Sequence, residues 1–256
     1  MRSGQVFDAL VLAGGGKPEP LTEQEGVTNK AFIMLNNRPL LRYILKALED
    51  APSVDRIVAV GPESNLEMLR QEGINFEILP EKESMLDNVA AGFASVDQNR
   101  LCLVVSGDIP LLTAEVVEEF IRLCAPYDSD FYYPLLSRET CLQHFPETER
   151  TYVRLKEGYV TGGNIGLLMP DWFFNNRDRL EMFISYRKKP LKLLRILPLF
   201  LIIKYLLKSL SVADLERSLS RLLRFKARAV PCECVEIGVD VDKISDLELI
   251  RRVLQG

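Results

Sequence analysis

The first half of the chain alternates short apolar runs with stretches whose apolar residues recur at helical spacing. Apolar runs of strand length lie at residues 7–12, 56–60, 76–79 and 101–106. Helical spacing lies at residues 39–50, 65–72, 85–95 and 114–124. Strands that read as continuous apolar runs are typical of parallel sheets covered on both faces. The pattern therefore predicts an α/β fold with a mostly parallel sheet and helices on both faces.

The pattern changes after about residue 128. Strand-like stretches lie at 131–133, 151–155, 159–169 and 236–241, with a hairpin turn at 156–158. Residues 171–225 read as largely helical, and a closing helix is predicted at 245–254 with Ser245 as its N-cap. We find no repeat or linker. We therefore expect a single domain over residues 1–256, with a helical insertion at approximately 171–228.

The most apolar segment of the chain is 190–210. Its longest charge-free run, 196–203, contains Pro198 and is far shorter than the ~20 residues that span a bilayer. Lys192, Arg195, Lys204 and Lys208 interrupt it. Two interpretations stay open. The segment forms helices buried against the domain, or it presents a basic, apolar surface to a membrane, a lipid-like substrate or a second copy of the chain.

Composition narrows the classes of function. The 256 residues include 32 Lys and Arg against 36 Asp and Glu, a net charge of −4, so no basic field favours a nucleic-acid partner. The single histidine, His144, excludes chemistry that needs two imidazoles. Five cysteines are too few for a disulfide scaffold, and Asp8 interrupts the N-terminal apolar run before it reaches signal-peptide length. We therefore expect a cytoplasmic protein.

The first predicted strand runs directly into Leu12, Ala13, Gly14, Gly15 and Gly16. Glycines at the carboxyl end of a strand let the backbone turn sharply and point N–H groups at an anion. The spacing does not match the dinucleotide-binding fingerprint, and no Gly-Lys-Ser/Thr follows as in a Walker loop. Taken alone, the turn indicates an anion site only weakly.

Further motifs follow this turn in a fixed order. They are Asn29-Lys30-Ala31-Phe32, Ser106-Gly107-Asp108-Ile109-Pro110, Thr161-Gly162-Gly163-Asn164 and Asp240-Val241-Asp242 with Asp246-Leu247. In this combination the sequence resembles the MobA-like nucleotidyltransferases, a superfamily that includes molybdenum-cofactor guanylyltransferase and sugar-phosphate nucleotidyltransferases. The resemblance implies a Rossmann-like, GT-A-like nucleotide-diphospho-sugar transferase fold. It also implies Mg²⁺-dependent transfer of a nucleoside monophosphate from a nucleoside triphosphate to a phosphorylated small-molecule acceptor, with release of pyrophosphate.

The resemblance also implies roles for individual residues. Lys30 and Asp108 would be catalytic, Lys30 by contacting the phosphates and Asp108 by binding Mg²⁺. Asp242, with Asp240 as the alternative, would supply the second carboxylate. Gly163 and Asn164 would face the acceptor. The nucleotide would be bound by Leu12, Ala13, Gly14, Gly15, Lys17, Ser84, Asn88 and Gly107.

The loop after the glycines departs from the family pattern, which usually carries an arginine there. Residues 16–28 are acidic and contain no arginine. Either Lys17 supplies the missing cation, as a point charge rather than a planar fork, or the loop has diverged. Two other functions therefore stay open, a glycosyltransferase of the same fold class and a non-catalytic nucleotide- or partner-binding protein. Glycosyltransferases usually place Asp-x-Asp where this chain has Ser106-Gly107-Asp108.

Overall fold

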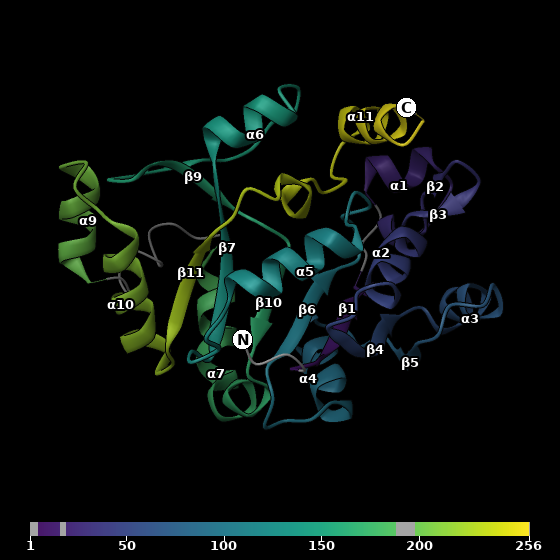
Figure 1. The fold of residues 1–256 in the computed structure, drawn as a ribbon, viewed down its shortest axis with the longest axis horizontal. Coiled ribbons are helices and arrows are strands. Elements are labelled where there is room, and N and C mark those ends of the chain that lie inside the picture. The colour runs from purple at the N-terminus through teal and green to yellow at the C-terminus, as the bar shows by residue number, and fades with distance from the viewer. Residues whose placement is uncertain (1–4, 16–18, 188–197, 256) are drawn as a thin grey trace.

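A computed structural model describes residues 5–15, 19–187 and 198–255 (Figure 1). Within them, a nine-stranded mixed sheet runs in the order β5-β4-β1-β6-β10-β7-β9-β8, and β11 pairs with β7. The strands are β1 (Phe7–Leu12), β4 (Val54–Gly61), β5 (Glu77–Pro80), β6 (Cys102–Ser106), β7 (Phe131–Ser137), β8 (Val153–Leu155), β9 (Gly158–Gly162), β10 (Ile165–Leu168) and β11 (Ala227–Pro231). Strands β5, β4, β1 and β6 are parallel, as the sequence predicts.

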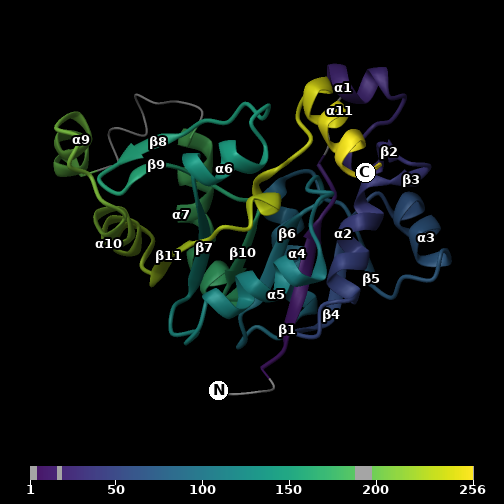
Figure 2. The same ribbon diagram turned by 45° about the horizontal axis from the view of Figure 1, so that its top comes forward.

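Helices cover both faces of the sheet, as predicted. On β1, Ala9 and Val11 belong to the cluster that includes α2 (Leu40–Glu49) and α5 (Ala114–Leu123). The intervening Leu10 packs on the opposite face with α4 (Met85–Ser95) and α7 (Pro170–Arg187). Alternate residues of one strand therefore anchor two helical layers, because successive side chains point to opposite faces. Figure 2 shows these helices on the two sides of the sheet.

The remaining elements complete the layers at the rim of the sheet. They are α1 (Pro20–Gln24), the 3₁₀ turn η1 (Lys30–Phe32), the β2–β3 hairpin (Met34–Leu35 and Arg38–Pro39), α3 (Glu63–Gln71), α6 (Arg138–His144), α9 (Leu199–Leu206), α10 (Val212–Leu223), η2 (Val235–Gly238) and α11 (Ile244–Val253). The short elements α1, β2, β3 and α6 are not predicted from periodicity. The division of the chain into one domain with an insertion at 171–228 stays a prediction, although helices α7, α9 and α10 fall within it.

Three predictions about the second half are wrong. The stretch 159–169 forms two strands, β9 and β10, because Gly163 and Asn164 leave the ladder between them. The stretch 236–241 forms no strand, and the last strand is β11 instead. The closing helix starts at Ile244 rather than at a Ser245 cap, because the Asp246 carboxylate accepts the backbone N–H of Lys243 at 2.8 Å.

The segment after η2 crosses the sheet edge instead of joining the sheet. Asn164 donates its backbone N–H to the Ile237 carbonyl at 2.7 Å, and Val241 donates its N–H to the Asp108 carbonyl at 3.0 Å. These single bonds replace a strand ladder. They fix residues 237–242 above the point where β6 ends and β10 begins.

The apolar segment predicted at 190–210 lies only partly within the described residues, since 188–197 fall outside them. Of the rest, Leu201 on α9 is buried with Leu155 and Val160 of β8 and β9. The exposed side includes Leu199, Leu206 and Leu207, at 69%, 72% and 70% exposure. The described part of the segment is therefore a surface helix that is buried on one side only. Among the described residues, no helix is both long and apolar enough to span a bilayer.

Candidate active site

The glycine-rich turn lies beside the end of β6. Gly107 donates its backbone N–H to the Leu12 carbonyl at 2.9 Å, which joins the carboxyl ends of β1 and β6. Gly15 has φ of +80°, a conformation that side chains other than glycine rarely adopt. A Cβ on Gly14 would lie 2.8 Å from the Glu81 Cβ. The turn therefore needs glycine at both positions.

A cavity of about 460 Å³ opens at this edge of the sheet. The residues that line it are Leu12, Ala13, Gly14, Gly15, Glu19, Asn29, Lys30, Ala31, Glu83, Met85, Ser106, Gly107 and Asp108. Seven of the predicted site residues thus surround one space, namely Leu12 to Gly15, Lys30, Gly107 and Asp108. Lys17 lies outside the described residues.

Asn29 holds the turn that carries Lys30. Its side-chain amide donates to the Ala13 carbonyl at 2.7 Å, and its side-chain oxygen accepts the Ala31 backbone N–H at 2.9 Å. The buried asparagine therefore ties η1 to the glycine-rich turn. Because both contacts are buried, they fix the direction in which the Lys30 side chain leaves the backbone.

Lys30 contacts two carboxylates. Its Nζ lies 2.5 Å from Asp242 Oδ1 and 3.0 Å from Glu19 Oε2. Burial lowers the pKa of Lys30, but the hydrogen bonds to Asp242 and Glu19 outweigh that effect and leave its pKa above the ordinary value. Lys30 is therefore a permanent positive charge at the cavity wall.

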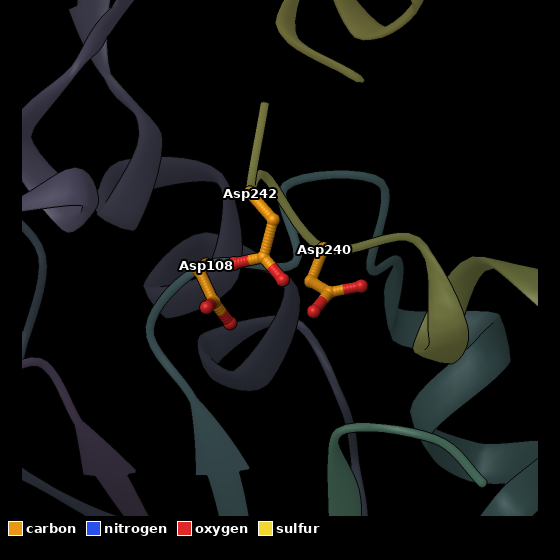
Figure 3. Close-up of side chains that lie close together, drawn as sticks. All are labelled: Asp108, Asp240 and Asp242. Atoms are coloured by element: carbon orange, nitrogen blue, oxygen red, sulfur yellow. The ribbon is translucent and has the colours of Figure 1, made fainter. Parts of the chain in front are cut away.

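Asp242 belongs to a cluster of three aspartates, which Figure 3 shows. Carboxylate oxygens of Asp108, Asp240 and Asp242 all lie within 4.8 Å of one another. Asp108 follows β6, and the Ser106 hydroxyl donates to its Oδ1 at 2.6 Å. The other two come from the segment that crosses the sheet edge. Sequence reasoning treats Asp240 and Asp242 as alternatives, whereas the structure brings both to Asp108.

The electrostatics of the cluster favour a cation. Burial raises the pKa of Asp108, and the nearby Asp242 raises it further, against the hydrogen bond from Ser106 and the charge of Lys30. Burial and the charges of Asp108 and Asp242 raise the pKa of Asp240 to about 6. The protein alone therefore does not fully stabilise the negative charges of Asp108 and Asp240.

The donor set fits Mg²⁺, which prefers hard oxygen ligands in an octahedron at about 2.1 Å. Opposite ligands of such an ion are about 4.2 Å apart, which is compatible with oxygens that all lie within 4.8 Å of one another. Small side-chain rotations would bring the three oxygens onto one ion. The remaining positions would be left to phosphate oxygens and water, as is usual for Mg²⁺.

Ser84 and Asn88, which are predicted to bind the nucleotide, do not line the cavity directly. Ser84 caps α4 by accepting the Asp87 backbone N–H at 3.1 Å, and it does not line the cavity, whereas its neighbours Glu83 and Met85 do. Asn88 is buried, and its side chain accepts the Lys82 N–H at 2.5 Å. Asn88 therefore supports the wall from behind.

Gly163 and Asn164 lie on the other side of the cluster, outside the cavity lining. Asn164 accepts the Ser106 N–H at 2.9 Å with its backbone carbonyl. A Cβ on Gly163 would lie 3.0 Å from the Ile237 side chain. Both residues therefore pack β10 against the segment that carries Asp240 and Asp242.

Three charged residues near the site escape sequence reasoning. Glu19 contacts Lys30, and Glu81 accepts the Gly15 N–H at 2.8 Å, in the place where an anion would bind. Arg150 Nη2 lies 3.7 Å from Asp240 Oδ1. Glu19 lies in the acidic loop 16–28, and the acidity of that loop is a weak sequence signal for a contact with Lys30. No sequence motif surrounds Glu81 or Arg150, because only tertiary folding brings these residues to the site.

Comparison with solved structures identifies other proteins with this fold. A solved structure described as a hypothetical transferase from Thermus thermophilus is 36% identical, covers 94% of this chain and 99% of its own, and superposes with a TM-score of 0.83. The 4-diphosphocytidyl-2C-methyl-D-erythritol synthase of Anaerococcus prevotii shares the fold, with a TM-score of 0.59 at 12% identity over 99% of this chain and 100% of its own.

Curated relatives match the chain over part of its length. The probable molybdenum cofactor guanylyltransferase of Thermococcus kodakarensis is 31% identical over 37% of this chain and 45% of its own. The ribitol-5-phosphate cytidylyltransferase of Vibrio parahaemolyticus is 27% identical over 47% of this chain and 54% of its own. The chain spans about half the length of such relatives. The model of one family covers most of the chain, residues 9–230, and the protein therefore belongs to the family of MobA-like NTP transferase domains.

Proposed function

We propose that the protein is a Mg²⁺-dependent nucleotidyltransferase. It transfers a nucleoside monophosphate from a nucleoside triphosphate to a phosphorylated small molecule, a sugar phosphate or a similar acceptor, and releases pyrophosphate. The observation that carries the proposal is a cavity lined by the glycine-rich turn, Lys30 and Asp108, with Asp240 and Asp242 clustered on Asp108. The names of the cytidylyltransferase relatives, which specify phosphorylated polyol acceptors, support the acceptor class.

The reaction requires little covalent chemistry from the protein. An oxygen of the acceptor phosphate attacks the α-phosphorus, a P–O bond forms, and the bond to the β-phosphate oxygen breaks as pyrophosphate leaves. Catalysis is then mainly positioning and charge stabilisation. The backbone amides of the glycine-rich turn and the ammonium of Lys30 would hold the triphosphate. Asp108, Asp240 and Asp242 would hold Mg²⁺, which supplies charge compensation on the phosphate oxygens.

Pyrophosphate release tests this proposal. Each of the four common ribonucleoside triphosphates is offered with Mg²⁺, with and without ribitol 5-phosphate, 2-C-methyl-D-erythritol 4-phosphate or a hexose 1-phosphate. We expect release that requires both a triphosphate and a phosphorylated acceptor. Release without an acceptor, or nucleoside diphosphate release from a sugar nucleotide, would contradict the proposal, the latter in favour of a glycosyltransferase.

A second candidate is a non-catalytic nucleotide-binding protein. Two contacts favour it, because Glu81 occupies the Gly15 amide and Glu19 shares the charge of Lys30. Both acids would have to move before a triphosphate reaches these donors. Triphosphate binding without pyrophosphate release from any pair of substrates is the outcome that this candidate predicts.

We also propose that α9 contacts an anionic membrane surface from the cytoplasm. All five cysteines are free thiols, which is in keeping with a reducing compartment. Apolar side chains cover the exposed side of α9, and no acidic residue lies between Glu181 and Asp214. The basic residues in that interval are Arg187, Lys188, Lys189, Lys192, Arg195, Lys204 and Lys208. Lys204 pairs with Asp214 at 2.8 Å, and residues 188–197 lie outside the described residues, so the basic character of the segment rests on its sequence. Exposed apolar groups on a segment of basic sequence match a lipid surface that carries negative charge.

Vesicle flotation tests the membrane contact. We expect the protein to float with phosphatidylcholine vesicles that contain phosphatidylglycerol, and less at high salt because the basic residues are screened. Replacing Leu206 and Leu207 by glutamate should abolish flotation, whereas Met68→Glu, at a residue 58% exposed on α3, should not. No flotation, or a dimer that the double variant breaks, would overturn the membrane assignment.

A further inference from the structure

Arg150 carries a buried positive charge with few partners. It lies between α6 and β8, and its side chain is only 10% exposed. Its ion pair with Asp240, at 3.7 Å, is longer than a hydrogen bond. Among the residues that the structure describes, no hydrogen bond involves its guanidinium, which has five N–H donors. The guanidinium keeps some exposure to solvent, so these unpaired N–H donors can reach a ligand beside Asp240.

The segment that carries Asp240 leaves room for this guanidinium. A Cβ on Gly238 would lie 2.5 Å from Arg150 Nη1 and 2.5 Å from the Leu136 Cδ1. Any side chain at residue 238 would therefore displace the arginine or Leu136 from its present position. Gly238 and Asp240 belong to one short segment, so the same backbone positions both the carboxylate and the arginine.

A second cavity begins on the far side of Arg150. It measures about 440 Å³, and Arg150, Arg138, Tyr152 and Tyr159 are among the residues that line it. The Arg138 guanidinium lies over both rings, 5.9 Å from the centroid of Tyr152 and 5.7 Å from that of Tyr159. Arg150 therefore contacts Asp240 and also lines a cavity whose walls include two arginines, two tyrosines and Glu149.

We propose that Arg150 binds the phosphate of the acceptor, and that this second cavity holds the rest of a small phosphate monoester. The inference rests on the proposed function, in which an acceptor phosphate oxygen must come close to the three aspartates. A phosphate dianion beside three carboxylates needs a cation of its own. Lys30 is held by Glu19 and Asp242, which leaves Arg150 for the acceptor among the described basic residues paired with this cluster. A planar guanidinium can donate two parallel hydrogen bonds to a phosphate.

Equilibrium binding tests the inference without turnover. Ribitol 5-phosphate, ribitol and inorganic phosphate are titrated calorimetrically in the presence of Mg²⁺, and nucleoside triphosphates are titrated separately. We expect the unmodified protein to bind the two phosphates and to discriminate against ribitol. Arg150→Ala should weaken phosphate binding about tenfold or more, as expected for a charge-assisted hydrogen bond, and leave triphosphate affinity within about twofold. Arg150→Lys should retain part of the affinity.

Two further variants control this experiment. Arg154→Ala removes an exposed guanidinium that lies over the Tyr159 ring, 5.7 Å from its centroid, and should leave phosphate binding unchanged. Gly238→Ala keeps the arginine but displaces it, and should reproduce the loss even if Arg150→Ala folds poorly.

The inference is overturned if Arg150→Ala and Arg154→Ala bind phosphate equally well, or if Arg150→Ala loses triphosphate and phosphate affinity alike. Failure of the proposed function is a different result, namely no triphosphate binding or no pyrophosphate release. The phosphate titrations can be interpreted independently of that result.

Discussion

Asp108→Asn is expected to lower Mg²⁺-dependent transfer about 1000-fold or more while the fold remains intact. Losing one of three carboxylates weakens charge compensation that is worth several kcal/mol to phosphoryl transfer. Asparagine has nearly the same shape and can still accept the Ser106 hydroxyl, which lies 2.6 Å from Oδ1. Burial and Asp242 raise the pKa of Asp108, so its charge opposes folding of the metal-free protein. The variant should therefore melt at the same temperature as the unmodified protein, or higher, without metal.

Pyrophosphate release and thermal melting, each with and without Mg²⁺, check this expectation. Mg²⁺ should raise the melting temperature of the unmodified protein and have little effect on Asp108→Asn. The matched control is Asp128→Asn, which removes an exposed aspartate that pairs with Lys226 at 2.7 Å, far from the site. Transfer within a few-fold of normal in Asp108→Asn would remove the metal assignment. A much lower melting temperature without metal would contradict the argument from burial.

The first half of the fold is predictable because its strands are buried on both faces. Such strands read as unbroken apolar runs, and the helices between them keep a regular apolar stripe. The strand pattern also places Gly14 and Asp108 after the carboxyl ends of two parallel strands, which share one edge of the sheet. The expectation that the two residues form one site comes from the family resemblance.

The segment 236–241 shows where such reasoning ends. Ile237, Val239 and Val241 are buried and alternate with Glu236, Gly238 and Asp240, which is the pattern of a half-buried strand. Alternation reports which side chains are buried, but it does not say whether a neighbouring strand offers a ladder. Here the partners are single carbonyl and amide groups of Asn164 and Asp108. The segment therefore crosses the sheet edge and brings Asp240 and Asp242 to the site together.

Arg150 and Glu81 are site residues that the sequence alone does not predict. Each lies far along the sequence from the residue it contacts, with Arg150 beside Asp240 and Glu81 on the Gly15 amide. Neither stands in a motif, and the charge of either one alone is ordinary for a surface residue. Only the fold reveals that an acid faces the glycine-rich turn and that a base faces the three clustered aspartates.

Lys30→Ala is expected to weaken triphosphate binding or transfer by about 1 to 3 kcal/mol, roughly 5- to 150-fold, the scale of hydrogen bonds to charged groups. The pKa of Lys30 is raised by Asp242 and Glu19 despite burial, so the ammonium stays charged across the neutral range. Its removal would take a cation from the phosphates and deprive Asp242 of the lysine that pairs with it. The cluster then becomes more negative, so Mg²⁺ affinity should hold or rise while triphosphate affinity falls.

Opposite changes in these two affinities distinguish a phosphate-binding lysine from a structural one. Both are measured by titration at low salt, where screening is weakest. Lys30→Arg should recover much of the triphosphate affinity, because it restores the charge. Lys46→Ala, which removes a lysine from an exposed pair with Glu49 and Asp50 on α2, should change neither affinity. If Lys30→Ala loses Mg²⁺ and triphosphate affinity together, the lysine serves to hold the aspartates in place, and the phosphate contact must come from the backbone amides alone.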